Sequence, residues 1–212
     1  MRNIRLLIEY DGRKFGGWQK QPSSLNIQGE IEKAIFEITG EEVELIGSGR
    51  TDRGVHAFGQ VANFKIESDR IPVEKFAVAL NSKLKNSIRI QRAEEVEESF
   101  HSRYSVHSKT YRYVINNSEF GTAIFREFEY CFPIKLDVPK MEEAISYFIG
   151  EHDFKGFKAS GTSSKSSVRT IYDAKVFQDG DRVCIELTGN GFLYNMVRII
   201  SGTLLDVGIR KN

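Results

Sequence analysis

The chain has 212 residues, of which 40% are apolar or aromatic and a further 18 are glycine. This composition is typical of a globular protein and excludes an intrinsically disordered chain. No stretch approaches the roughly 18 consecutive apolar residues of a membrane-spanning helix, and Glu9 and Asp11 interrupt the apolar N-terminal stretch. We therefore expect neither a membrane span nor a secretory signal. The length suits one large domain or two domains of about 100 residues each.

The charges nearly cancel, because 30 Lys and Arg against 29 Asp and Glu give a net charge of +1. They are segregated along the chain: acidic residues cluster at 41–44 and 94–98, and basic residues cluster at 50–53, 101–112 and 155–169. Such segregation can give a neutral protein a basic face that binds a polyanion, although charge clusters more often form solvated surface. The Ser-rich stretch Ser160–Ser167 is interpreted either as a mobile basic loop on a polyanion or as a plain linker.

Cysteine and histidine are too few and too scattered for a disulfide framework or a zinc site. The two cysteines, Cys131 and Cys184, have no CxxC partner, and the four histidines show no metal-ligand spacing. We therefore expect no metal site, and the reducing cytoplasm is the expected compartment.

The hydrophobic periodicity of the first half predicts alternating strands and helices. Residues 2–10 are predicted as a buried strand. A helix is predicted between Asn26, which can cap its start, and Gly40, which can end it. Its apolar positions recur at helical spacing: Ile27, Ile31, Ala34, Ile35 and Ile38. Two strands, a helix and a last strand follow at 43–46, 60–66, 72–80 and 88–96. This is the order of a ferredoxin-like unit.

The second half predicts a looser version of the same arrangement. Strands are expected at 108–115, 127–132, 170–177 and 182–187, and a helix is expected at 139–149. A last helix is predicted with its apolar residues on one face: Phe192, Met196, Ile199, Ile200 and Leu204. We therefore predict an α+β fold of two ferredoxin-like (RRM-like) units with mainly antiparallel sheets flanked by helices. The predicted domains are residues 1–100 and 101–212.

The densest group of polar residues lies at 47–57, between two predicted strands. Its glycines allow sharp turns and a close approach to a ligand. Asp52 lies between Arg50 and Arg53, whose charges favour an ionised carboxylate that would suit a nucleophile. An Asx-turn with solvated arginines is the structural alternative, and dinucleotide binding is disfavoured because the partial glycine fingerprint lacks its third glycine. His56 could hold a phosphate or the loop.

The segment 100–113 interleaves aromatic rings with basic side chains, among them Arg103. Rings can stack on bases while cations meet phosphates, so the pattern indicates nucleic-acid binding. In a strand, Lys109, Tyr111 and Tyr113 would share one face. We expect Tyr113 in the core, whereas the role of Tyr111 depends on its depth in a cleft.

Arg198 lies in a predicted helix that is otherwise strongly apolar. A buried charge without a partner is costly, so its guanidinium must either reach water or pair with an acid. Extension of the long side chain to the surface is the ordinary outcome for such a residue.

Taken in chain order, six parts of the sequence resemble the tRNA pseudouridine synthase A (TruA) family. They are residues 7–12 with 15–19, and then 49–57, 79–81, 100–103, 109–113 and 195–198. The resemblance implies a pseudouridine synthase fold. It also implies cofactor-independent conversion of uridine to pseudouridine in the anticodon arm of tRNA, around positions 38 to 40, by a homodimer.

The resemblance also implies roles for particular residues. Asp52 matches the family's catalytic aspartate, Arg198 the arginine that pairs with it, and Tyr111 the tyrosine beside the target base. The residues implied to help hold the RNA are Arg50, Arg53, His56 and Arg103. Family members continue past the last helix, whereas this chain stops at residues 209–212, so we expect a truncated or partial chain.

Two alternatives stay open at this point. A non-catalytic RNA-binding module on the same fold would explain the aromatic and basic segment but not the loop at 49–57. A small-molecule carboxylate hydrolase would need a second acid near Asp52, for which Asp11 and Glu9 are candidates. For the synthase itself, attack by Asp52 on ribose C1′, attack on uracil C6 and promotion of the loss of a ribose proton all stay open.

Overall fold

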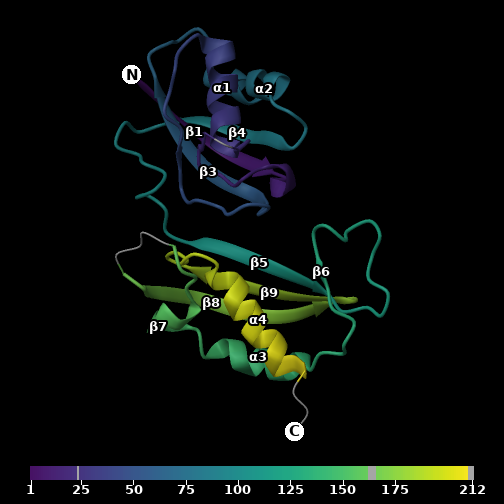
Figure 1. The fold of residues 1–212 in the computed structure, drawn as a ribbon. Coiled ribbons are helices and arrows are strands. Elements are labelled where there is room, and N and C mark those ends of the chain that lie inside the picture. The colour runs from purple at the N-terminus through teal and green to yellow at the C-terminus, as the bar shows by residue number, and fades with distance from the viewer. Residues whose placement is uncertain (23, 162–165, 210–212) are drawn as a thin grey trace. The chain divides into compact units, whose positions relative to one another are not determined.

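The computed structural model describes residues 1–22, 24–161 and 166–209 (Figure 1). The chain forms two compact units, Met1–Val106 and His107–Asn212, each with a sheet and a hydrophobic core of its own. The predicted domain ranges, 1–100 and 101–212, stay predictions. None of the helices in the described part of the chain has the length and apolarity that crossing a bilayer requires.

The first unit is a four-stranded antiparallel sheet with two helices. Its sheet has the order β2-β3-β1-β4, so β1 pairs antiparallel with both β3 and β4. The strands are β1 (Arg2–Tyr10), β2 (Ile46–Gly47), β3 (Ala57–Ile66) and β4 (Ile88–Val96). The helices are α1 (Ile27–Thr39) and α2 (Val73–Lys83), and a short 3-10 turn, η1 (Gly12–Lys14), follows β1.

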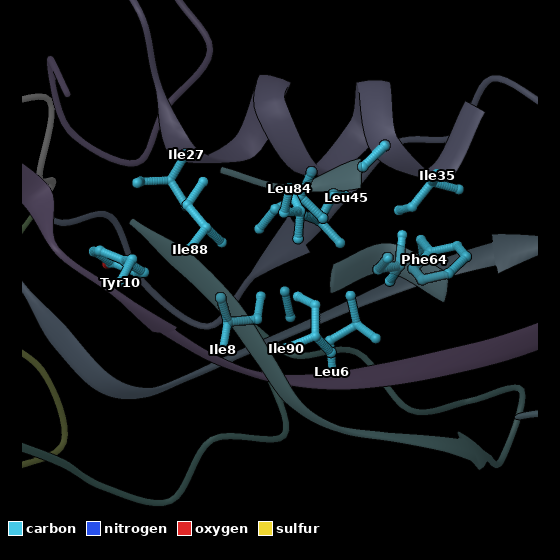
Figure 2. Packing of buried hydrophobic residues seen from close by; sticks show 14 of the residues in the cluster. Leu6, Ile8, Tyr10, Ile27, Ile35, Leu45, Phe64, Leu84, Ile88 and Ile90 are labelled. Carbon is cyan, nitrogen blue, oxygen red and sulfur yellow. The ribbon is translucent and has the colours of Figure 1, made fainter. Parts of the chain in front are cut away.

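The core of the first unit forms because the apolar face of β1 meets that of α1. Alternate β1 residues are buried: Ile4, Leu6, Ile8 and Tyr10. Figure 2 shows Ile27 and Ile35 of α1 pointing toward Leu6 and Ile8 of β1. The ends of α1 are as predicted: the Asn26 side chain accepts a hydrogen bond from the Gly29 N–H at 2.8 Å, and Gly40 ends the helix with a φ of 79°.

The second unit is a five-stranded sheet with two helices on one face (Figure 1). The sheet has the order β6-β5-β9-β8-β7, and only the pair β5–β6 is parallel among the described strands. The strands are β5 (Lys109–Asn116), β6 (Tyr130–Cys131), β7 (Gly150–Asp153), β8 (Val168–Asp179) and β9 (Arg182–Gly189). The remaining elements are α3 (Val138–Ser146), the 3-10 turn η2 (Lys155–Phe157) and α4 (Met196–Ile209). Residues Ile185, Ile200 and Leu204 are fully buried between sheet and helices.

The predicted fold class, α+β with two mostly antiparallel sheets, is confirmed, and several element bounds are corrected. The strand predicted at 43–46 is reduced to Ile46–Gly47, because the Leu45 N–H donates to the Glu32 carboxylate at 3.1 Å instead of to a neighbouring strand. The strand predicted at 127–132 is reduced to Tyr130–Cys131, because the N–H groups of Phe128 and Glu129 turn back to the Phe125 carbonyl.

Three further predictions differ from the structure or lie outside it. Phe192 precedes α4 and is not part of the last helix, and β7 is a strand that the sequence did not predict. Much of the predicted loop at Ser160–Ser167 lies outside the described residues, as do residues 210–212 at the end of the chain.

Candidate active site

Asp52 lies on the loop that joins β2 to β3, and the first part of this loop is fixed to β3. The Ser48 N–H donates to the Val61 carbonyl at 2.8 Å. The Ser48 hydroxyl donates to Gln60 Oε1 at 2.7 Å, and Gln60 Nε2 donates to the Gly49 carbonyl at 2.6 Å. Ser48 and Gln60 are buried, so these bonds are sheltered from water. The loop therefore leaves β2 in a defined direction.

The residue before Asp52 is held by the segment that follows β1. The hydroxyl groups of Tyr10 and Thr51 are hydrogen-bonded at 2.7 Å, and the Trp18 N–H donates to the Thr51 carbonyl at 3.1 Å. Gly17 adopts a φ of 111°, and a Cβ at this position would lie only 2.6 Å from the Thr51 carbonyl oxygen. Glycine is thus required for the close approach of this segment to the loop. The Asp52 side chain is half-buried at the tip of the loop.

The far end of the loop is held by His56 and the turn η1. His56 Nδ1 lies 3.3 Å from the Gly12 N–H, which donates to it, and 3.2 Å from Asp11 Oδ1. Burial lowers the pKa of His56 and thereby favours the neutral ring that this contact with Gly12 needs. Hydrogen bonds from Arg13 lower the pKa of Asp11, whose carboxylate also caps η1. His56 thus contacts the segment that follows β1, and its predicted contact with the RNA stays a prediction.

The predicted RNA-binding arginines of the first unit are exposed around this loop. Arg50 and Arg53 flank Asp52, and Arg103 follows β4 in a turn that begins at His101. None of these three side chains has a hydrogen-bond or ion-pair partner among the residues that the structure describes. Arg50 and Arg103 line one small pocket, so the fold brings these two distant residues together.

Tyr111 and Arg198 belong to the second unit. Lys109, Tyr111 and Tyr113 share one face of β5, because they pair with Gly189, Leu187 and Ile185 on β9. This confirms the predicted alternation, and Tyr113 packs against the core as expected. The half-buried ring of Tyr111 meets the Phe192 ring edge-on, with 5.0 Å between the centroids.

Arg198 is exposed in the first turn of α4 and has no ion pair within the described residues of its own unit. It lies near Tyr113: burial raises the pKa of Tyr113, and the positive charge of Arg198 opposes that rise. Asn195, just before α4, adopts a φ of 57°. Such a backbone conformation is uncommon outside glycine, and it is enriched at functional sites.

The predicted residues thus fall into two groups. Asp52, Arg50, Arg53, His56 and Arg103 lie in the first unit, whereas Tyr111 and Arg198 lie in the second. The predicted pairing of Asp52 with Arg198 stays a prediction. Within residues 1–22, 24–161 and 166–209, no group of three or more His, Cys, Asp or Glu side chains is placed to hold a metal ion.

Sequence reasoning missed the residues that hold the Asp52 loop, namely Tyr10, Gly17 and Trp18. All three lie in the 7–12 and 15–19 stretches that carry the family resemblance. It also missed the contact of Phe192 with Tyr111, for which an aromatic residue just before the last helix was the available signal.

Comparison with known proteins places the chain in a family. A family model described as tRNA pseudouridine synthase matches residues 6–105 and 144–212, which include Asp52 and Arg198 but not Tyr111. The chain is 56% identical to the tRNA pseudouridine synthase A of Caldicellulosiruptor saccharolyticus over 211 residues, spanning 100% of this chain and 86% of that protein. It is 52% identical, over the same shares, to the enzyme of that name from Acetivibrio thermocellus and 48% identical to that from Clostridium acetobutylicum. The resemblance drawn from six sequence segments is confirmed, and the chain belongs to the tRNA pseudouridine synthase family.

Proposed function

We propose that this chain isomerises uridine to pseudouridine in the anticodon arm of tRNA, around positions 38 to 40, with the Asp52 carboxylate as the catalytic group. The observation that carries the proposal is the way the Asp52 loop is held. Thr51 is fixed from β1 and from Trp18, and the loop ends are fixed by Gln60 and His56. A carboxylate held in this way is preorganised, as a group that must meet one reacting atom has to be.

The reaction needs no oxidant, reductant or second substrate. The bond between N1 of uracil and C1′ of ribose breaks, the ring turns, and a bond between C5 and C1′ forms. The proton on C5 leaves and N1 gains one, so product and substrate are isomers. Asp52 would act on C1′, on C6 or on a ribose proton, and all three routes use an ionised carboxylate.

The other site residues have supporting roles in this proposal. By the family resemblance, Arg198 keeps the Asp52 carboxylate ionised and oriented, and a charge-assisted hydrogen bond of this kind contributes about 1.5–3 kcal/mol. A stacked uridine must be flipped out at a cost of a few kcal/mol, and stacking on Tyr111 would offset part of that cost. Arg50, Arg53 and Arg103 would meet phosphates, so tRNA binding should weaken steeply with salt.

The structure bears differently on the two alternative functions, the carboxylate hydrolase and the RNA-binding module. The hydrolase needs Asp11 or Glu9 as a second acid, but Arg13 lowers the pKa of Asp11 and Gln91 donates a hydrogen bond to Glu9. The lowered pKa of Asp11 does not favour proton donation by this carboxyl group at neutral pH. The RNA-binding module remains the alternative to be tested, because it accounts for the exposed arginines without using Asp52.

We further infer that the chain acts as a homodimer in the cytoplasm. The dimer rests on the family resemblance, and light scattering coupled to size-exclusion chromatography should give twice the mass of 24.2 kDa. A stable monomer at assay concentrations would contradict it. Both cysteines, exposed Cys131 and buried Cys184, carry free thiols, which agrees with a reducing compartment.

The experiment for the proposed function maps pseudouridine in an unmodified tRNA transcript after incubation with the chain. We expect pseudouridine only at uridines of the anticodon arm, and none with Asp52→Asn, while filter binding shows that this variant still holds the tRNA. Product at other positions would contradict the assignment to the anticodon arm. Binding without product for the unaltered chain would favour the RNA-binding module.

A further inference from the structure

A small pocket lies beside the start of the Asp52 loop, within the first unit. Its volume is about 120 Å³, and its lining includes Trp18, Gly47, Gly49, Arg50, His101 and Arg103. These residues come from the segment after β1, from β2 and the β2–β3 loop, and from the turn after β4. The mechanism proposed for Asp52 does not require a pocket at this place.

The two arginines of the pocket differ from most arginines of the chain. Arg5 is paired with Glu94, and Arg13 with Asp11. Arg50 and Arg103, in contrast, have neither a hydrogen-bond nor an ion-pair partner among the described residues. Glu44 is the one carboxylate among the residues that line the pocket, against two guanidinium groups. The pocket therefore carries a net positive charge.

One wall of the pocket is the rigidly held ring of Trp18. This residue is 3% exposed, and its backbone is bonded on both sides: its N–H donates to the Thr51 carbonyl, and its carbonyl accepts from the Gln28 N–H at 3.0 Å. Gly47 lies directly against the ring, since a Cβ there would come within 2.7 Å of the indole. The wall is thus fixed to both the catalytic loop and α1.

Another part of the lining is a turn that is anchored on the sheet. The buried Ser102 N–H donates to Asn63 Oδ1 of β3 at 2.9 Å. His101 Nδ1 accepts from the Arg103 N–H at 3.2 Å, which leaves the proton of the neutral ring on Nε2. The His101 ring also contacts the Tyr104 ring at a tilt of 32°, with 4.4 Å between the ring centroids. Arg103 and His101 are therefore held as donors on a defined backbone.

The size and the donors define the ligand. Pockets for whole drug-sized molecules or cofactors measure about 300–1,000 Å³, so this pocket is too small for them. Two guanidinium groups and an imidazole N–H recognise a small oxyanion. We propose that the pocket binds one phosphodiester group of the RNA substrate, held jointly by Arg50 and Arg103. This inference rests on the proposed function.

Such a contact would set the position of the RNA relative to Asp52. Contacts to phosphates fix the register of a nucleic acid on a protein, whereas contacts to bases specify sequence. Arg50 is separated from Asp52 only by Thr51, whose hydroxyl and carbonyl are both held. Only one held residue separates Arg50 from Asp52. A phosphate bound by Arg50 and Arg103 would therefore have a defined position relative to the Asp52 carboxylate.

The test is a scan of an anticodon-arm RNA in which each phosphate in turn is replaced by an uncharged methylphosphonate. Trp18 is the single tryptophan of the chain, so its fluorescence reports both binding and occupancy of the pocket. We expect one replacement to weaken binding to the unaltered chain about tenfold, and to have no effect on the double variant Arg50→Gln/Arg103→Gln, which has lost both arginines that hold that phosphate. Arg70→Gln is the matched control, because Arg70 is also exposed and without a side-chain partner among the described residues but does not line the pocket.

A second measurement tests whether the two arginines share one phosphate. The slope of log affinity against log salt becomes shallower by about 0.7–0.9 for each phosphate that the protein no longer neutralises. We expect a total decrease of this size, equal to one phosphate, for the double variant Arg50→Gln/Arg103→Gln. A decrease of about twice this size for the double variant would show two separate phosphates and overturn the shared site.

The inference is also overturned if every methylphosphonate affects the unaltered chain and the double variant Arg50→Gln/Arg103→Gln equally. The scan measures binding and not turnover, so its outcome is separable from the proposed function. Pseudouridine formation without such a phosphate would overturn the pocket alone. The expected scan without any pseudouridine formation would leave the pocket in place and contradict the catalytic assignment.

Discussion

The hydroxyl groups of Tyr10 and Thr51 lie 2.7 Å apart and join the end of β1 to the residue that precedes Asp52. Tyr10 is 3% exposed and its ring packs in the core of the first unit. The Asp52 loop is thereby attached to a central strand of the sheet through a side-chain bond to Thr51, while the Trp18 N–H holds the Thr51 carbonyl. Because the Tyr10 ring is part of the core, the position of the Asp52 carboxylate depends on the packing of the sheet.

Removal of the Tyr10 hydroxyl should disturb the position of the Asp52 carboxylate but not the binding of tRNA. Tyr10→Phe should lose about 1 kcal/mol of unfolding free energy and lower kcat for pseudouridine formation severalfold, with little change in KM for tRNA. Thr51→Val should do the same, and the double variant should be less affected than the sum of the two, because both remove one bond. The prediction is contradicted if Tyr10→Phe raises KM by as large a factor as it lowers kcat. It is also contradicted if the effects of Tyr10→Phe and Thr51→Val add up fully in the double variant, because the bond would then not position the loop.

A methyl group at Gly12 should displace the Asp52 loop. A Cβ there would lie 1.9 Å from the Val55 carbonyl oxygen, a backbone atom that cannot move without the loop. Gly12→Ala should therefore cost at least about 1–3 kcal/mol of unfolding free energy and abolish most activity. Gly59→Ala is the control, since the nearest atom to its Cβ is the flexible end of Leu7 at 3.4 Å. Denaturant unfolding of both variants decides the prediction, and similar stabilities would contradict it.

Two glycines of α4 should respond oppositely to alanine. Gly202 has no neighbour within 4 Å of a Cβ, so Gly202→Ala should stabilise the helix by about 0.5–1 kcal/mol. At Gly208 a Cβ would lie 2.8 Å from Met141 Sδ and 3.1 Å from Leu136, so Gly208→Ala should destabilise the unit. Thermal unfolding measures both changes, and a shared sign would show that α3 and α4 do not pack closely at Gly208.

The stability of the chain should fall with decreasing pH near the ordinary pKa of histidine, in part because of His56. Burial lowers the pKa of His56 below its usual 6.5, whereas Asp11 raises it and Arg13 lowers it. Below pH 6.5 the unfolded chain therefore binds a proton that the folded chain does not, and stability falls until the pH reaches the lowered pKa of the folded state. His56→Asn, whose amide oxygen can still accept from Gly12, should show a shallower decline between about pH 7 and pH 5.5 in urea unfolding. Parallel curves for the two proteins would contradict the assignment to His56.

The elements that sequence analysis predicted well are those with long apolar periodicity and clear end signals. β1 and β4 were predicted with the bounds that the structure shows, and α1 begins at its Asn26 cap and ends at Gly40. β7, with the sequence GEHD, carries no alternation of apolar residues, and it forms only because β8 offers its edge. Such an element depends on tertiary pairing and leaves little trace in the local sequence.

For the site, the polar loop and its carboxylate could be found from sequence, whereas its supports could not. Gly49 to Ala57 is a local motif that is visible without a structure. The bond between Tyr10 and Thr51 joins residues that are 41 positions apart, and the pocket joins Arg50 to Arg103 across β3 and β4. Contacts of this kind are made by the strand order β2-β3-β1-β4, which no local pattern encodes.

The central claim is most directly tested with a tRNA transcript that carries tritium at C5 of its uridines. Formation of the new C5–C1′ bond must release that label to water. Under single-turnover conditions, we expect release by the unaltered chain and by Asp69→Asn, a matched change at an exposed aspartate outside the site, and no release by Asp52→Asn despite retained tRNA binding. Release by Asp52→Asn at the unaltered rate, or no release by the unaltered chain while it binds the tRNA, would contradict the catalytic role of Asp52.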